Sequence, residues 1–154
     1  MKFPFLPAAF AALTLLLAGC LTTPTAESGG MGSTTVPNTN VTAIISSAQT
    51  VFGQYGYTPG PMNYPASISF DKPSDTFGKI LYGSYGTTTS IRVKLTITQL
   101  GATNNYLLAT HVSRVTNAGE AGFEESRKMI GLWSGEFGPL LKQINAQAAN
   151  QGQY

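Results

Sequence analysis

The chain has 154 residues, with nine Lys and Arg, seven Asp and Glu and one His, which gives a formal net charge of +2. Charged residues make up 10% of the chain, against about 25% in ordinary globular domains. This balance excludes a strongly basic surface for nucleic acid, and the length suits one domain. The single cysteine and single histidine exclude a metal site built from pairs of such residues, and we expect no cofactor.

The first twenty residues have the pattern of an export signal. Lys2 precedes an apolar run over residues 3–17, and small residues follow it. This order is typical of a secretory signal peptide, and the run is shorter than the roughly 20 residues that cross a bilayer. The stretch Leu17-Ala18-Gly19-Cys20 that ends the run resembles the lipobox of bacterial lipoproteins at each of its four positions.

The lipobox resemblance implies cleavage between Gly19 and Cys20 and attachment of a diacylglyceryl group to the Cys20 thiol, with palmitate or a similar chain on the new amino group. Two or more acyl chains anchor firmly, at about 0.8 kcal/mol per buried CH₂. We therefore expect residues 1–19 to be a lipoprotein signal peptide, and the membrane to be reached through acylated Cys20. The alternative is an ordinary secretory signal with an incidental cysteine. In the best-studied bacteria an aspartate after the cysteine retains a lipoprotein in the inner membrane, and Leu21 here favours the periplasmic face of the outer membrane.

The segment after the cysteine is rich in Thr, Ser, Gly and Pro. Such a composition buries too little apolar surface to offset the entropy of ordering. We therefore predict that residues 20–39 are the lipidated cysteine and a flexible tether. The folded part is predicted to be a single domain over residues 40–149, followed by a tail over residues 150–154.

The first predicted element is a helix over about residues 40–55. Asn40 is its expected N-cap and Gly56 its expected C′ residue. The helix carries no charged side chain, so its stability must come from packing its apolar stripe. Spaced at helical intervals, the stripe consists of Val41, Ile44, Ile45, Ala48, Val51, Phe52 and Tyr55.

Residues 55–65, rich in Tyr, Pro and Gly, are predicted to form a stiff loop. Exposed tyrosines on a stiff backbone make good contact surfaces, because few rotamers are frozen on binding. Tyr57 and Tyr64 are therefore candidate contact residues. The alternative is that these tyrosines fold back and cap the end of the core.

Four strands are predicted next, at about residues 67–71, 79–85, 91–98 and 106–115. The third alternates apolar and polar residues without a break, which indicates an antiparallel sheet with one face in water. Turn residues at 101–105 join the last two strands into a hairpin. Arg92 and Lys94 lie on the polar face and are candidates for docking an acidic partner. The alternative is that they keep this face hydrated and discourage edge pairing.

The last stretch has apolar residues at helical spacing, interrupted by glycines and by Pro139. Because proline is comfortable at the start of a helix, we predict a helix over about residues 139–149. Residues 124–137 are predicted to be a kinked helical piece or an irregular arm. Trp133 and Phe137 are expected to seal the sheet edge, or else to form an exposed patch.

These elements predict an α+β fold of order α-β-β-β-β-α. It is a two-layer sandwich, with a four-stranded antiparallel sheet and the N- and C-terminal helices on one face. In outline the order is similar to the small helix-on-sheet domains of accessory envelope lipoproteins, including those of the outer-membrane barrel-assembly machinery. That similarity carries no motif and therefore no site residues.

The sequence favours a protein that is not an enzyme. His111 is the sole histidine, and neither a Gly-x-Ser-x-Gly turn nor a phosphate-binding loop is present. Our hypothesis is a lipid-anchored, non-catalytic envelope lipoprotein acting as a structural or protein-interaction module, with an envelope protein as partner. The alternative is a carrier or sensor of a small apolar ligand, held between helix and sheet beneath Phe52, Trp133 and Phe137.

Overall fold

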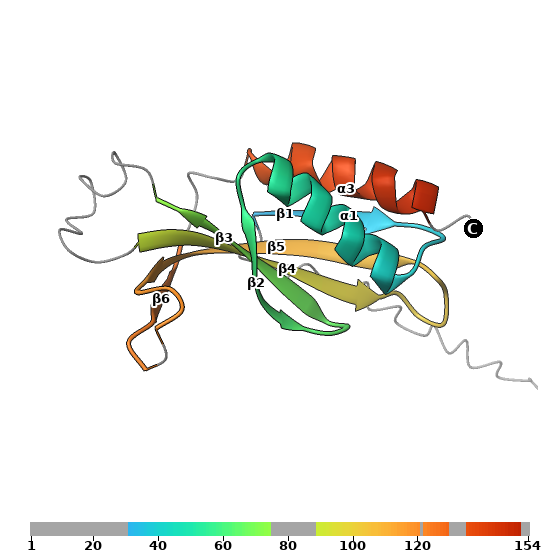
Figure 1. Cartoon of the computed structure of the whole chain (residues 1–154). Helices are drawn as coiled ribbons and strands as arrows, with labels where there is room; N and C mark the ends of the chain where they lie inside the picture. The colour runs from blue at the N-terminus through green and yellow to red at the C-terminus, as the bar shows by residue number, and fades with distance from the viewer. Residues whose placement is uncertain (1–30, 75–88, 121, 130–134, 152–154) are drawn as a thin grey trace, which may run out of the picture.

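The structure is a computed structural model that describes residues 31–74, 89–120, 122–129 and 135–151 (Figure 1). The predicted signal peptide, Cys20, the strand expected at 79–85 and Trp133 lie outside these residues. In chain order the elements are β1 (Gly32–Val36), α1 (Val41–Gln54), β2 (Thr58–Asn63), β3 (Ser67–Pro73), β4 (Thr89–Gln99), β5 (Tyr106–Thr116), β6 (Glu125–Lys128) and α3 (Phe137–Gln151).

All of the described strand pairs are antiparallel. The strands follow the order β1-β5-β4-β3-β2, and β6 also pairs with β5, along 113–116, beyond the part that pairs with β1. The predicted α+β class with an antiparallel sheet and two helices is confirmed. The predicted number of four strands is wrong, because the sheet is six-stranded over the described residues.

Strand β1 lies in the segment predicted to be a flexible tether. It pairs with β5 over five residues, and its Val36 is fully buried in the core. The composition of this segment does not predict a strand. Its Gly32 leaves room for α3, since a Cβ at this position would lie 3.3 Å from Leu141 Cδ1. The Asn145 amide also donates to the Thr35 carbonyl at 3.0 Å. The folded domain therefore begins before residue 40.

Strand β2 replaces much of the predicted Tyr-Pro-Gly loop. Among the described strands it pairs only with β3, with a register shift between Pro59 and Met62. An edge strand tolerates proline, because a residue that faces away from the neighbouring strand needs no N–H donor. The same prolines remove donors that an added strand would need, so this edge of the sheet is a poor template for further pairing.

Strand β6 corrects the prediction for residues 124–137. Residues 125–128 are not helical: they pair with β5, and all four are exposed. Helix α3 is confirmed, but it runs from Phe137 to Gln151 and so takes in the first two residues of the predicted tail. Pro139 lies in the first turn of α3, where backbone N–H groups have no partner inside the helix in any case.

Helix α1 begins and ends as its sequence predicts. The Asn40 side chain accepts a hydrogen bond of 2.8 Å from the Ala43 backbone N–H. Gly56, just past the helix, has a φ of +80°, which glycine adopts without the strain of a Cβ.

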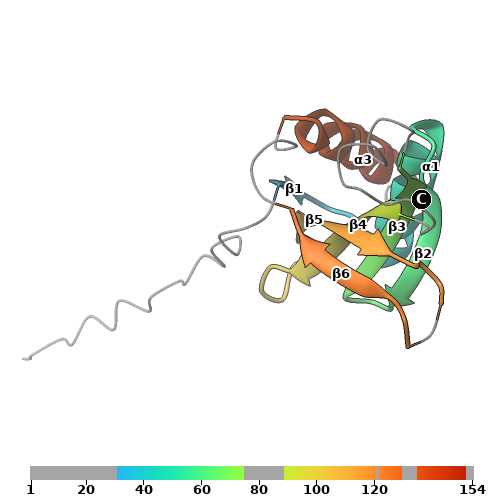
Figure 2. The same ribbon diagram turned by 90° about the vertical axis from the view of Figure 1, so that its left-hand side faces the viewer.

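The core contains buried residues of both helices and of β1, β3, β4 and β5. Figures 1 and 2 show α1 and α3 side by side. The alternating pattern of β4 is confirmed: Val93 and Leu95 are fully buried. The largest fully buried side chains are Phe52, Phe70, Phe137, Ile44, Ile68, Leu95, Leu108, Leu141 and Ile144.

Candidate functional site

The second face of the sheet is polar, and strand register shows which side chains share it. Lys94 lies opposite Ser69 on β3 and opposite His111 on β5. Thr98 lies opposite Leu107, which in turn pairs with Thr35 of β1. We call this surface the polar face and define it by the exposed or half-buried residues Ser33, Thr35, Arg92, Lys94, Thr96, Thr98, His111 and Ser113.

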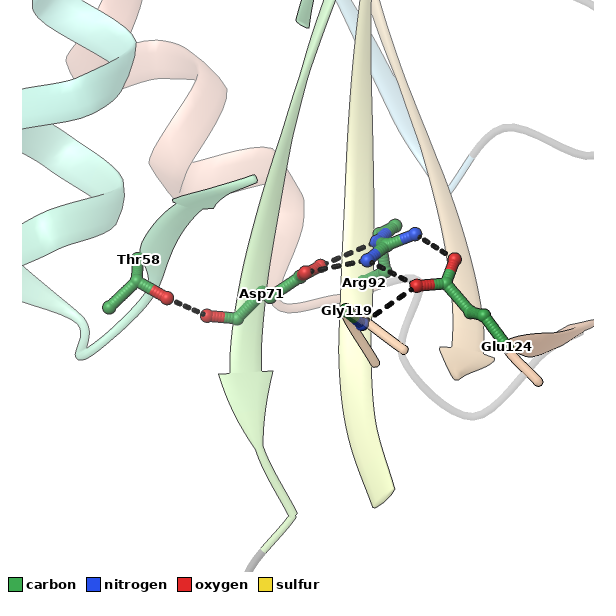
Figure 3. A network of polar contacts seen from close by, with 5 residues as sticks. All are labelled: Thr58, Asp71, Arg92, Gly119 and Glu124. Atoms are coloured by element: carbon green, nitrogen blue, oxygen red, sulfur yellow. Dashed lines mark hydrogen bonds and ion pairs between the residues drawn. The ribbon is translucent and has the colours of Figure 1, made fainter. Parts of the chain in front are cut away.

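Arg92 on β4 is the centre of an ion network on the polar face (Figure 3). Its Nε and Nη2 donate to the two carboxylate oxygens of Asp71, each at 2.7 Å. Its Nη1 and Nη2 also donate to the carboxylate of Glu124, in the loop before β6. The Arg92 side chain is only 14% exposed, so the predicted docking cation is already engaged within the chain.

The network shifts the pKa values of Arg92 and Glu124. The hydrogen bonds to Asp71, opposed by burial and supported by Glu124, raise the pKa of the Arg92 guanidinium above its ordinary value. The hydrogen bond from Arg92 lowers the pKa of the Glu124 carboxyl, and the Gly119 backbone N–H, which donates to it at 3.1 Å, lowers it further. Arg92 therefore stays charged and holds the loop before β6 against the sheet.

Lys94 differs from Arg92 although the two are neighbours on one strand. Its side chain is exposed on the polar face, and within the described residues it takes part in no ion pair. Lys94 is thus the predicted cation that remains available to a partner. His111 lies beside it, and within the described residues no group of three or more His, Cys, Asp or Glu side chains could hold a metal ion.

The candidate tyrosines separate onto different surfaces. Tyr57 is 7% exposed and packs edge-on against Phe52, with ring centroids 5.4 Å apart. Tyr57 therefore packs into the core, the placement that the alternative prediction for these tyrosines describes. Tyr64 is 61% exposed and remains a contact candidate. The predicted set Tyr57, Tyr64, Arg92 and Lys94 therefore does not form one surface.

A pocket lies where the C-terminal end of α1, the end of β3 and the start of α3 meet. Its volume is about 390 Å³. The Lys72 ammonium is 5.2 Å from the centroid of the Tyr57 ring, within the range of a cation–π contact. Burial, together with the negative charge of Glu136, raises the pKa of the Tyr57 hydroxyl. The lining residues are Tyr55, Tyr57, Lys72, Glu136, Phe137, Pro139 and Leu140.

Sequence reasoning missed this pocket and the partners of Arg92. Lys72 and Glu136 are far apart in the chain and belong to no motif, so only the fold brings them to one pocket. Asp71 lies on the polar side of its strand, opposite Arg92, and that alternation was the one available signal for the ion pair. Glu124 approaches from the loop before β6, where no periodic pattern exists.

No family model matches the chain, and no curated protein matches it significantly. Among the helices that the structure describes, none is both long and apolar enough to cross a membrane.

Proposed function

We propose that the protein is a lipid-anchored, non-catalytic envelope lipoprotein that acts as a structural or protein-interaction module. The observation that carries this proposal is the stretch Leu17-Ala18-Gly19-Cys20, which ends a short apolar run and holds the only cysteine of the chain. Acylation of that thiol provides a firm anchor. Leu21 after the cysteine favours the periplasmic face of the outer membrane over the inner membrane.

The proposal includes a layered arrangement in which both helices cover the apolar sheet face. The buried stripes of α1 and α3 belong to the same core cluster as the apolar residues of β3, β4 and β5, which supports this arrangement. In it the polar face is the broad surface left to meet a partner.

The chemistry of the polar face indicates the kind of partner. Lys94 and Thr98 are exposed on β4, and Ser33 and Thr35 are exposed on β1. Hydroxyl groups beside the exposed Lys94 ammonium suit a polar partner surface that carries an acidic group. The partner in this proposal is an envelope protein.

The lipid anchor is tested by replacing Cys20 with serine. We expect wild-type protein in the membrane fraction, carrying label from radioactive palmitate, and Cys20→Ser protein without label and released from the membrane. The reason is that a serine hydroxyl provides no thioether for the acyl group. The matched control is Thr22→Ser, which should stay labelled and membrane-bound. A Cys20→Ser protein of unchanged mass that remained in the membrane would contradict the anchor.

The polar face is tested by placing a photoreactive benzoylphenylalanine at single positions in cells. We expect crosslinks to a discrete envelope protein from positions 94 and 98, because both side chains are exposed on the polar face. Position 142, exposed on α3, is the matched control and should give no such product. Equal products from all three positions, or none from 94 and 98, would count against an interface on the polar face.

A ligand-carrying function is the second candidate, and the pocket beside Tyr55 is the observation that favours it. The place expected from the sequence was beneath Phe52. There the Phe52 ring stacks on Phe70, with centroids 4.3 Å apart, and meets Tyr57 edge-on. The available space therefore lies at the end of the helix layer, and its walls carry charges that an apolar ligand would leave unpaired.

A further inference from the structure

The lining of the pocket at the junction of α1, β3 and α3 includes two opposite charges. The Lys72 ammonium and the Glu136 carboxylate both line it, yet within the described residues they form no ion pair with each other. Both side chains are exposed, so water solvates each charge in the free protein. A ligand with one anionic and one cationic group could replace the water at both of these charges.

The remaining lining is mainly apolar. Phe137, Pro139 and Leu140 come from the first turn of α3, and Tyr55 and Tyr57 come from the end of α1 and the residues after it. The Tyr55 hydroxyl accepts a hydrogen bond of 3.1 Å from the Gln143 amide, which fixes the ring that forms one wall. Such a lining suits an aliphatic or aromatic side chain.

Size narrows the class of ligand. The volume of about 390 Å³ lies near the lower end of the roughly 300–1,000 Å³ of small-molecule pockets. An amino acid or a dipeptide fits this range, whereas a diacyl lipid is too large. A polyphosphate is disfavoured, because Glu136 would repel it and Lys72 alone would offset its charge.

We propose that this pocket binds a free amino acid or dipeptide with an apolar side chain. The ligand carboxylate pairs with Lys72, its ammonium pairs with Glu136, and its side chain packs on Phe137 and Leu140. This site is separate from the polar face, and the inference does not depend on the lipid anchor or on a protein partner.

The test measures binding of matched probes to the full-length chain, purified in a nonionic detergent, by isothermal titration calorimetry with a detergent blank. The probes are L-phenylalanine and L-alanyl-L-phenylalanine, each also as its N-acetyl and its carboxamide derivative. We expect each blocked probe to bind at least ten-fold more weakly than its zwitterion, because one charge in the pocket then loses its partner.

Two variants assign the charges. Lys72→Gln should bind the acid and the carboxamide equally, while still preferring the free amine. Glu136→Gln should bind the free amine and the N-acetyl probe equally, while still preferring the acid. Lys94→Gln, which removes an exposed cation on the polar face, is the matched control and should bind as wild type does. Unchanged melting temperatures would show that all three variants fold.

Three outcomes would overturn the proposal. The first is that no zwitterion binds at millimolar concentration. The second is that neutral derivatives, a neutral sugar or a fatty acid bind as tightly as the zwitterions. The third is that Lys72→Gln and Glu136→Gln weaken all probes equally, because a loss without selectivity indicates a change of shape and not the loss of a charge partner.

Discussion

Replacing Phe52 with alanine should lower the free energy of unfolding by about 3–5 kcal/mol, the usual cost of removing a buried aromatic ring. Phe52 is fully buried and contacts two rings at once, stacked on Phe70 and edge-on to Tyr57. Since a domain of this size has only about 5–15 kcal/mol of stability in total, the variant should be close to unfolding at room temperature. Urea unfolding followed by far-ultraviolet circular dichroism measures the loss.

The control for Phe52→Ala is Tyr64→Ala, another aromatic removed, but from a side chain that is 61% exposed. Its effect should stay within about 0.5 kcal/mol, as is usual for surface positions. Phe52→Leu keeps most of the volume and should lie between the two. If Phe52→Ala and Tyr64→Ala had the same midpoint, the packing of α1 on the sheet through Phe52 would be wrong.

The elements predicted correctly are those whose side chains repeat with the period of their structure. The apolar stripe of α1, its Asn40 cap and the alternation of β4 each follow from local rules, and the structure confirms them. Helix α3 also follows from its spacing, because Leu140, Leu141 and Ile144 all enter the core.

The elements that were missed are short strands without a clear repeat. Strand β1 contributes one large buried side chain, Val36, and depends on β5 and on Asn145 for the rest of its stability. Strand β2 contains two prolines and a register shift, both of which a local pattern associates with a loop. Such strands exist because the neighbouring strand pairs with them, and that information is not local.

The candidate site residues were predictable only where the exposure of a side chain does not depend on contacts with other residues. Lys94 and Tyr64 were predicted at the surface and lie there. The sequence makes Tyr57 and Arg92 surface candidates too, but their contacts in the fold decide their roles. Phe52 packs against the Tyr57 ring, and Asp71 and Glu124, both far away in the chain, bind the Arg92 guanidinium. The alternation of polar and apolar residues predicts the sheet face on which a side chain lies. It does not predict whether that side chain is already bound by another residue of the chain.

Replacing Arg92 with methionine should cost about 2 kcal/mol of stability. Breaking a fully buried ion pair costs about 3–5 kcal/mol, and we scale this down because the Asp71 and Glu124 side chains are 19% and 30% exposed. The variant leaves both carboxylates without their guanidinium partner while keeping a side chain of similar length. Urea unfolding of wild type, Arg92→Met, Asp71→Asn and the double variant gives the coupling energy of the pair.

The control for Arg92→Met is Lys94→Met, the same loss of charge two residues along the same strand. Because Lys94 is exposed and has no ion pair within the described residues, its effect should stay within about 0.5 kcal/mol. Equal losses from the two variants would show that the network does not hold the fold together.

The same network predicts how stability depends on pH. Arg92 lowers the pKa of Glu124 in the folded state. The stability that the Arg92–Glu124 contact contributes is therefore fully present above the pKa of Glu in the unfolded chain, about 4.3. It is lost as the pH falls through the pKa of Glu124 in the folded state. In Arg92→Met the pKa of Glu124 should rise toward its ordinary value, although the Gly119 N–H still lowers it. Carboxyl-carbon chemical shifts of Glu124, recorded against pH in wild type and in Arg92→Met, measure this directly. A Glu124 titration identical in both proteins would mean that Arg92 does not hold this carboxylate, and the loop before β6 would need another tether to the sheet.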